Sequence, residues 1–250
     1  MKHTKSIIRI PLLVVMLWTG AACTTLDATD DPAQQTSSDP FVGINHKVYA
    51  FNNAADKVIL QPAARAYKTV LPNQAQHSVR RFFSNLNEPL NIVNNLLQGK
   101  VDGALNSTYR FAVNSTVGVL GLFDIAKLYG VDKRYEDLGQ TLAVWGVKPG
   151  PYVMVPFWGP STIRDGLGLV FESAAYYPIN EISDSNSAQS SLTLLNIIDN
   201  RAGLLDTSTI LDNQLDPYTF LKDAYDQNRL NAVYDGKPPE PRDDQIDFDF

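Results

Sequence analysis

The sequence has few of the residues on which catalytic, redox and metal chemistry depend. Its single cysteine, Cys23, can form no disulfide within the chain. Beyond residue 22 it has two histidines, His46 and His77, far apart and without a second histidine at the spacing of a metal site. It also lacks a glycine-rich phosphate loop and a Gly-x-Ser-x-Gly nucleophile turn. The sequence therefore gives no positive reason to predict an enzyme, a metal site or a bound cofactor.

Long apolar runs and an excess of positive charge are missing as well. No stretch approaches the roughly 20 apolar residues that span a bilayer, and the nearest candidate, residues 111–123, is interrupted by a polar triplet at 114–116. Residues 23–250 carry 18 basic and 27 acidic side chains, a net charge of about −9. This charge argues against nucleic-acid binding and against general attraction to anionic lipid. Any membrane contact beyond a lipid anchor must therefore be interfacial.

The N-terminus has the parts of a bacterial export signal. Three basic residues precede an almost wholly apolar run at 10–18, and Gly-Ala-Ala follows immediately before Cys23. A lipoprotein signal places its lipidated cysteine at this point, and the preceding residues resemble a lipobox. We therefore predict a signal peptide over residues 1–22 and lipidation of Cys23. An ordinary signal peptide with an incidental cysteine is the alternative.

The regions on either side of the body differ from it in composition. Thr24 follows the cysteine. In Gram-negative lipoproteins an Asp at this position resembles an inner-membrane retention signal, so Thr24 predicts transport of the protein to the outer membrane. Residues 23–38 are polar and without apolar period, which predicts a flexible, lipid-anchored tether. The acidic, proline-containing residues 236–250 predict a disordered tail. The body, residues 39–235, is long enough for a sizeable core.

Apolar residues recur at steps of three and four through most of the body, which is typical of amphipathic helices. No clear run alternates as a half-buried strand does, so the predicted fold class is all-α. Asp39 is expected to cap the first helix, Pro62 to break it, and Asp216 to cap the last. Gly99 is expected to end the helix that precedes it, and Ser161 or Thr162 to cap the helix after the central stretch. The predicted helices cover about residues 40–61, 63–70, 79–97 with a kink near Pro89, 104–113, 123–129, 162–177, 192–205 and 217–234.

Two polar features allow more than one interpretation. One helix carries an asparagine face (Asn85, Asn87, Asn91, Asn94 and Asn95), which is costly in helix propensity. We expect this face to be solvated, with buried polar partners as the alternative. The neighbouring acids at 136–137 could serve a hydrolase, but acids at a helix start more often accept hydrogen bonds from its N-terminal amides.

The stretch 146–160 combines apolar and aromatic side chains with four prolines and three glycines. Proline and glycine disfavour a long helix or a central strand here, although a short strand near 153–157 stays open. An irregular, aromatic-rich segment either packs in the core, lines a cavity or lies at a membrane interface, where Trp and Tyr are favoured. The segment alone does not decide among these placements.

A series of short motifs, several of them uncommon, occurs in order over about residues 39–235. They are Asp39-Pro40-Phe41-x-Gly43-x-Asn45, Val48-Tyr49-x-Phe51-Asn52, Asn85-Leu86-x-Glu88-Pro89, Asn94-x-Leu96-x-Gln98-Gly99, Arg110-Phe111-x-x-Asn114, Gly121-Leu122-Phe123-Asp124, Gly139-Gln140-Thr141-Leu142-x-x-Trp145-Gly146, Gly150-Pro151-Tyr152, Gly159-Pro160-Ser161-x-x-Arg164-Asp165 and Asp216-Pro217-Tyr218. Taken together, these motifs resemble those of the MlaA/VacJ family of outer-membrane lipoproteins.

The resemblance implies a ring of interfacial amphipathic helices in the inner leaflet of the outer membrane, around a central amphipathic channel. Phospholipids mislocalised in the outer leaflet would pass through it to a periplasmic carrier protein, for return to the inner membrane. The family associates with trimeric porins. This activity maintains lipid asymmetry and is not catalysis. A passive outer-membrane scaffold and a lipid-tethered cell-wall hydrolase are the alternatives.

A lipid channel needs a polar wall for the head group and apolar walls for the acyl chains. The central stretch is our candidate for the apolar and aromatic wall, and the first helix for a wall or gate element. Arg164 would hold a phosphate or pair with Asp165, and the pairing is what we expect. The candidate channel residues are Phe51, Asn52, Trp145, Tyr152, Val155, Phe157, Trp158 and Arg164.

Overall fold

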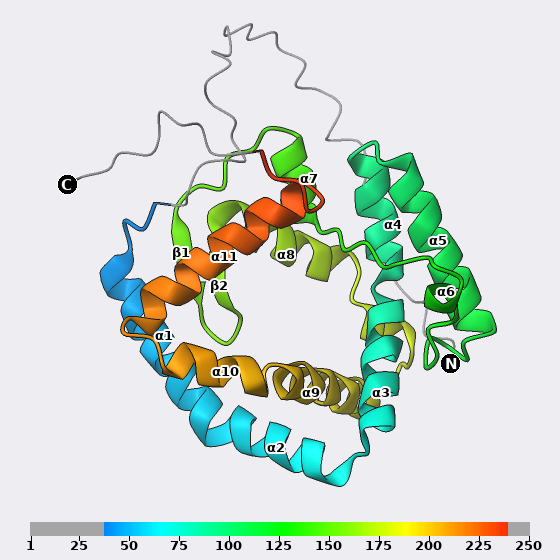
Figure 1. Cartoon of the computed structure of the whole chain (residues 1–250), viewed down its shortest axis with the longest axis horizontal. Coiled ribbons are helices and arrows are strands. Elements are labelled where there is room, and N and C mark those ends of the chain that lie inside the picture. The colour runs from blue at the N-terminus through cyan, green and yellow to red at the C-terminus, as the bar shows by residue number, and fades with distance from the viewer. Residues whose placement is uncertain (1–37, 240–250) are drawn as a thin grey trace, which may run out of the picture. The chain divides into compact units, whose positions relative to one another are not determined.

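The computed structural model describes residues 38–239, except for the side chain of Glu181. The predicted signal peptide, Cys23, almost all of the tether and most of the tail lie outside these residues. Short loops connect the elements, which are mostly helical, as predicted (Figure 1). In order they are α1 (Val42–Ala55), the π-helix η1 (Asp56–Leu60), α2 (Gln61–Val70), α3 (Asn73–Leu86), α4 (Glu88–Leu97), α5 (Val101–Thr116), α6 (Ile125–Leu128), α7 (Leu138–Val144), β1 (Tyr152–Val155), β2 (Gly159–Thr162), α8 (Ile163–Ala175), the 3₁₀-helix η2 (Pro178–Glu181), α9 (Asn186–Gly203), α10 (Leu205–Asp212) and α11 (Pro217–Val233).

The first helical segment corrects two expectations. Asp39 does not cap α1: the capping position is held by Phe41, and the Asp39 carboxylate instead accepts hydrogen bonds from Asn45 and Tyr218. Pro62 does not break the helix, because η1 leads directly into α2 and the proline lies in the first turn of α2. The first turn tolerates proline because its N–H groups need no intrahelical partner.

Other predicted helix ends are confirmed. The chain bends between α3 and α4, next to Pro89, and Gly99 ends α4 with a φ of 73°. Thr162 caps α8 by accepting a hydrogen bond from the backbone N–H of Asp165. Asp216 caps α11 by accepting from the N–H groups of the second and third residues after it. Each of these ends is formed by residues that are neighbours in the sequence, so local chemistry is sufficient to predict it.

The elements contact one another in a closed circuit (Figure 1). From α1 it runs through η1 and α2 to α9, then through α3, α4, α7 and α8 to the β-hairpin, which packs on α1 again. The last helix, α11, packs on α7 and β2, and α10 connects it to α2. Among residues 38–239, no helix combines the length and the hydropathy that a membrane crossing requires.

The central stretch forms an antiparallel hairpin, with Tyr152 opposite Thr162 and Val155 opposite Gly159. A side chain from α1 completes the free edge of β1. The Asn45 amide donates to the Tyr152 carbonyl at 3.1 Å and accepts from the N–H of Met154 at 2.9 Å. Among the described residues, this short hairpin is the one departure from the all-α prediction. Because every other element is helical, the structure is mostly helical, as the prediction requires.

Candidate functional site

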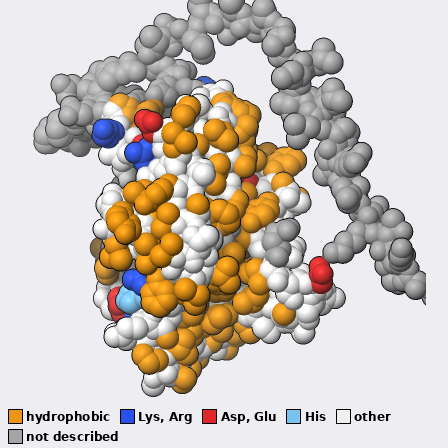
Figure 2. Space-filling model, turned by 90° about the vertical axis from the view of Figure 1, so that its right-hand side faces the viewer, with side chains coloured by type: hydrophobic (Ala, Val, Ile, Leu, Met, Phe, Trp, Pro, Cys, Tyr) orange, Lys and Arg blue, Asp and Glu red, His pale blue; other side chains and the backbone are white. Residues whose placement is uncertain are grey.

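The distribution of side chains is inverted relative to a water-soluble protein. Among the described residues, sixteen buried side chains are polar or charged and only twelve are hydrophobic, while large hydrophobic side chains are exposed on nearly every helix. Figure 2 shows hydrophobic side chains covering the side of the molecule formed by α4, α5 and α6. Soluble monomers rarely expose apolar patches of this extent, so this surface faces an apolar medium or a partner.

The outer apolar surface, as we call it, extends from α4 to the end of α6. Its centre is the loop 117–123, where Val119 and Leu120 have φ angles of 53° and 58°. Positive φ is costly for residues with a branched side chain, so the loop must be held by its surroundings. Backbone hydrogen bonds from Leu120 and Gly121 return to the end of α5. The surface comprises Val93, Leu96, Leu97, Val101, Leu105, Tyr109, Val117, Val119, Leu120, Phe123, Leu128 and Tyr129.

A buried ion-pair network lies beneath this surface. Arg110 on α5 is 4% exposed, and its guanidinium donates to Glu88 at 3.3 Å and to both carboxylate oxygens of Asp124, at 3.1 and 3.0 Å. Burial alone would raise the pKa of Asp124, but its bonds to Arg110 and Asn114 outweigh burial and lower the pKa. The network therefore fixes the loop end at Asp124 onto α4 and α5 through the buried charges of Arg110 and Glu88 and the partly exposed carboxylate of Asp124.

The asparagine face that we expected to be solvated is buried, with Asn87 half-buried as the exception. Asn91 donates to Glu88 and accepts from the N–H of Glu136. Asn94 donates to Glu172 at 2.6 Å and accepts from the hydroxyl of Thr141 at 2.8 Å. The prediction was wrong because three of these partners, Glu136, Thr141 and Glu172, lie 45, 47 and 78 residues farther along the chain, where sequence spacing cannot place them.

A second charged cluster joins α7, α8 and α11. Arg229 donates to both oxygens of Asp137, at 2.6 and 3.0 Å, and to Asp165 at 3.0 Å. Burial alone would raise the pKa of both carboxyls, yet Arg229 outweighs it and lowers the pKa of each. Asp137 also caps α7 by accepting from the N–H of Gln140, as expected for an acid at a helix start. The acids at 136–137 are thus engaged in the fold.

Arg164 takes the role that we expected in preference to phosphate binding. It is 5% exposed and donates to Asp165 at 2.8 Å. Its remaining contact, the Val147 carbonyl at 3.4 Å, also belongs to the protein. The carboxylate partner neutralises the guanidinium inside the fold, so this side chain has little surface to offer a lipid phosphate.

The other candidates from the central stretch separate into two groups. Tyr152 is fully buried, packed with Met154 and Tyr218, so its assignment to a channel wall is corrected: it belongs to the core. Val155 is half-buried. Trp145 is 53% exposed and donates its indole N–H to the Leu97 carbonyl.

The remaining candidates meet at the hairpin tip. Phe157 and Trp158 are each 70% exposed, and Phe157 has a φ of 65°. The Phe51 ring lies edge-on to that of Phe157, with centroids 5.2 Å apart. Asn52 donates to the Val155 carbonyl at 3.0 Å and accepts from the N–H of Phe157 at 2.8 Å. The structure thus brings the two predicted regions, the first helix and the central stretch, into direct contact.

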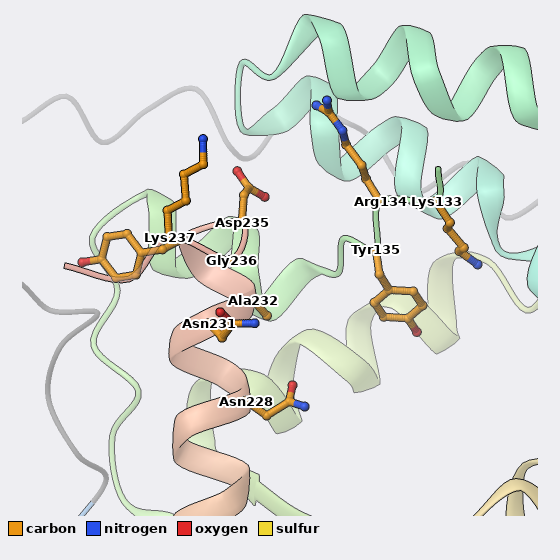
Figure 3. Close-up of a pocket in the computed structure, with 10 residues that line it drawn as sticks. Lys133, Arg134, Tyr135, Asn228, Asn231, Ala232, Asp235, Gly236 and Lys237 are labelled. Atoms are coloured by element: carbon orange, nitrogen blue, oxygen red, sulfur yellow. The ribbon is translucent and has the colours of Figure 1, made fainter. Parts of the chain in front are cut away.

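Sequence reasoning missed a pocket of about 650 Å³ between the segment before α7 and the end of α11 (Figure 3). Its cations are Lys133, Arg134 and Lys237, and Tyr135 continues from it into a neighbouring pocket of about 190 Å³. The only signal in the sequence was the basic pair at 133–134, which by itself resembles an ordinary solvated charge. The lining residues are Lys133, Arg134, Tyr135, Asn228, Asn231, Ala232, Tyr234, Asp235, Gly236 and Lys237.

Comparison with known proteins gives one consistent answer. The family model described as MlaA lipoprotein matches residues 37–232. The Escherichia coli "Intermembrane phospholipid transport system lipoprotein MlaA" is 33% identical over 220 residues, 86% of each chain. The Haemophilus influenzae protein of the same name is 29% identical over 244 residues, 96% of this chain and 95% of the relative. A solved structure described as "Structural basis for maintenance of bacterial outer membrane lipid asymmetry" is 33% identical, with a TM-score of 0.68 over 78% of this chain and 99% of the other.

Proposed function

Because this chain belongs to the MlaA lipoprotein family, we propose that it is the lipoprotein of an intermembrane phospholipid transport system. It removes mislocalised phospholipids from the outer leaflet of the outer membrane and so maintains lipid asymmetry. The names of its relatives, and the subject of the similar solved structure, support this proposal. The activity is transport rather than catalysis, and the charged residues described above stabilise the fold.

The observation that carries the proposal is the inversion of polarity. Exposed apolar side chains on α4, α5 and the loop after α5 favour a position among acyl chains, in the inner leaflet of the outer membrane. The polar groups lie between the helices, where they satisfy one another instead of meeting hydrocarbon. In this proposal the closed circuit of elements is a ring in the membrane plane, and its middle is an amphipathic channel for the lipid.

The partners are part of the same proposal. A trimeric porin would hold the ring in the membrane, and a periplasmic lipid-carrier protein would accept each phospholipid from it. A lipid on Cys23 would anchor the chain, with residues 24–38 as the tether. Because the chain has an excess of acidic side chains, its membrane attachment depends on this anchor and on apolar contact, and little on charge.

We assign the hairpin tip and the adjoining turn of α1 to the channel wall or gate. Phe51 and Phe157 present exposed aromatic surface beside each other, and Asn52 holds the tip by two hydrogen bonds to its backbone. Phe157 also has a backbone conformation that costs free energy, which is typical of functional segments. An aromatic contact of this kind can separate to let an acyl chain pass.

The first test is the outer-leaflet phospholipid content of cells, measured with an outer-membrane phospholipase reporter. Cells that lack the protein should accumulate outer-leaflet phospholipid, and Cys23→Ala should reproduce much of that effect. Phe51→Ala should give a partial loss of asymmetry and of detergent tolerance. Phe220→Ala removes a similarly exposed aromatic side chain from α11 and is the matched control.

Two outcomes would contradict the proposal. If lipid asymmetry is unchanged in cells that have no redundant system, the chain does not transport phospholipid, and a passive porin scaffold becomes the better interpretation. If Phe51→Ala and Phe220→Ala have the same effect at equal protein levels, the hairpin tip is not a gate. The second result would leave the transport function itself intact.

A further inference from the structure

The structure contains a basic pocket at the end of α11 that none of the roles described above uses. Two segments about a hundred residues apart form it: the chain before α7 and the chain that leaves α11. Its volume of about 650 Å³ lies in the range of small-molecule sites. In Figure 3 the side chains of Arg134 and Lys237 extend toward the same side of the pocket, with Asp235 between them.

The charges of this pocket are not balanced by the residues that line it. Most other basic side chains in the described part of the chain pair with a carboxylate, whereas Arg134 and Lys237 have none within residues 38–239. The one lining carboxylate, Asp235, is bound by Lys100 at 2.8 Å. Such a pocket is a positive site on a chain with a net negative charge, and it attracts an anion.

The donors present match a phosphate better than they match a neutral or apolar ligand. Arg134 supplies a planar guanidinium that can bind two phosphate oxygens at once, and Lys237 supplies a compact ammonium. The exposed amides of Asn228 and Asn231, one helical turn apart on α11, add neutral donors on one wall. Lys133 is already held by the carbonyl and hydroxyl of Ser84, so it contributes charge at longer range.

We infer that this pocket binds the phosphate of a phospholipid head group. The inference rests on the proposed function, since a phosphate is the group that every transported phospholipid carries. Tyr135 adds an amphipathic side chain between this pocket and the next one, which suits a ligand with a polar head and apolar chains. The pocket is therefore a station for the head group on the transport route, while the acyl chains stay on apolar surface.

The experiment compares binding of a short-chain lipid to the purified mature protein in phosphate-free detergent micelles. The probe is dibutyroyl-phosphatidylglycerol, followed by the line width of its ³¹P resonance. The test variant is Arg134→Gln combined with Lys237→Gln. The control, Lys47→Gln with Lys127→Gln, removes the same charge from two exposed lysines outside the pocket. The test variant should weaken binding about tenfold, since it removes two charge-assisted contacts that are partly exposed to water.

Further arms separate the possible anions. Inorganic phosphate at equal concentration should bind more weakly than the lipid; equal binding would overturn the assignment to a lipid. Removal of residues 240–250, which include five acidic side chains, should leave lipid binding unchanged. If their removal strengthens lipid binding severalfold, the tail competes with the lipid for the pocket, and the pocket of the full chain is not the open head-group site that we infer. Equal binding by test and control variants would also overturn the inference.

A cellular arm distinguishes failure of this inference from failure of the proposed function. If Arg134→Gln with Lys237→Gln keeps full lipid asymmetry and full lipid binding, the pocket is not on the route, but the protein still transports phospholipid. Only cells without the protein test the transport function itself. We expect the pocket variant to lose asymmetry partially, with the protein present at its normal level.

Discussion

Replacement of Arg110 by methionine is the strongest test of the buried charge network under the outer apolar surface. Methionine occupies a similar volume, so the change leaves no large cavity. It does remove the counter-charge of Glu88, which is 1% exposed, and of Asp124, whose side chain is 19% exposed. In the variant, the negative charges of Glu88 and Asp124 stay close to each other without the guanidinium that neutralises them in the native structure.

The expected magnitude follows from these exposures. Breaking a fully buried ion pair from one side costs about 3–5 kcal/mol. The lower end applies here, because Asp124 is partly solvated and the ammonium of Lys133 lies 3.9 Å from Glu88. We expect a loss of about 3 kcal/mol in the free energy of unfolding, which lowers Tm by roughly 6–12 °C in a protein of this size.

The assay is thermal unfolding followed by circular dichroism, in one detergent for all variants. The control is Arg81→Met: Arg81 is exposed on α3 and has no carboxylate partner in the described part of the chain, so its replacement should change stability by less than about 0.5 kcal/mol. Adding Glu88→Gln to Arg110→Met should recover part of the loss, because it removes an uncompensated buried charge. A Tm decrease below about 2 °C, or a double variant less stable than the single one, would refute the reasoning.

Three further predictions concern the hairpin, a half-buried acid and a tight turn. Asn52→Leu should speed hydrogen exchange at the hairpin tip without affecting α11, because it removes both hydrogen bonds to the tip; equal protection would contradict this. Burial raises the pKa of Glu172, so the native state holds that proton more tightly than the unfolded state. The contribution of Glu172 to the free energy of unfolding therefore grows as pH falls through the raised pKa, and it is fully present below the pKa of the unfolded state, near 4.3. Glu172→Gln should flatten that part of the profile, and an unchanged slope would exclude the group. Gly121→Ala should cost about 2–3 kcal/mol, since its φ is 90° and a Cβ would lie 2.4 Å from that of Asn85. Gly130→Ala, with a φ of 77° and open space, should cost only about 1 kcal/mol, and equal Tm losses would contradict the steric argument.

The helical character, most helix ends and the family could be predicted from the sequence. Thr162, Asp216 and Asp137 cap their helices through amides two or three residues away, so the chemistry is complete within a few positions. The position of Pro62 shows the limit of local reasoning: proline within a helical pattern was interpreted as a break, whereas a π-helical turn before it lets the helix continue.

Burial is what only the tertiary structure decided. An asparagine on a helix can hydrogen-bond water or a distant partner equally well, and nothing near Asn91 or Asn94 in the sequence distinguishes the two. Arg164 had one obvious partner next to it, and that pairing was foreseen. The fully buried Tyr152 was not, because an aromatic side chain serves a core and a membrane surface equally well.

The sequence by itself determined where helices form, which stretch is irregular and which family the chain resembles, because those properties depend on spacing and local backbone chemistry. The tertiary structure decided which faces are buried and which distant charges meet. Arg134 and Lys237 share a pocket only because α11 packs against α7 and carries its end back to the chain before it. Such a meeting depends on contacts a hundred residues apart, which no local pattern encodes.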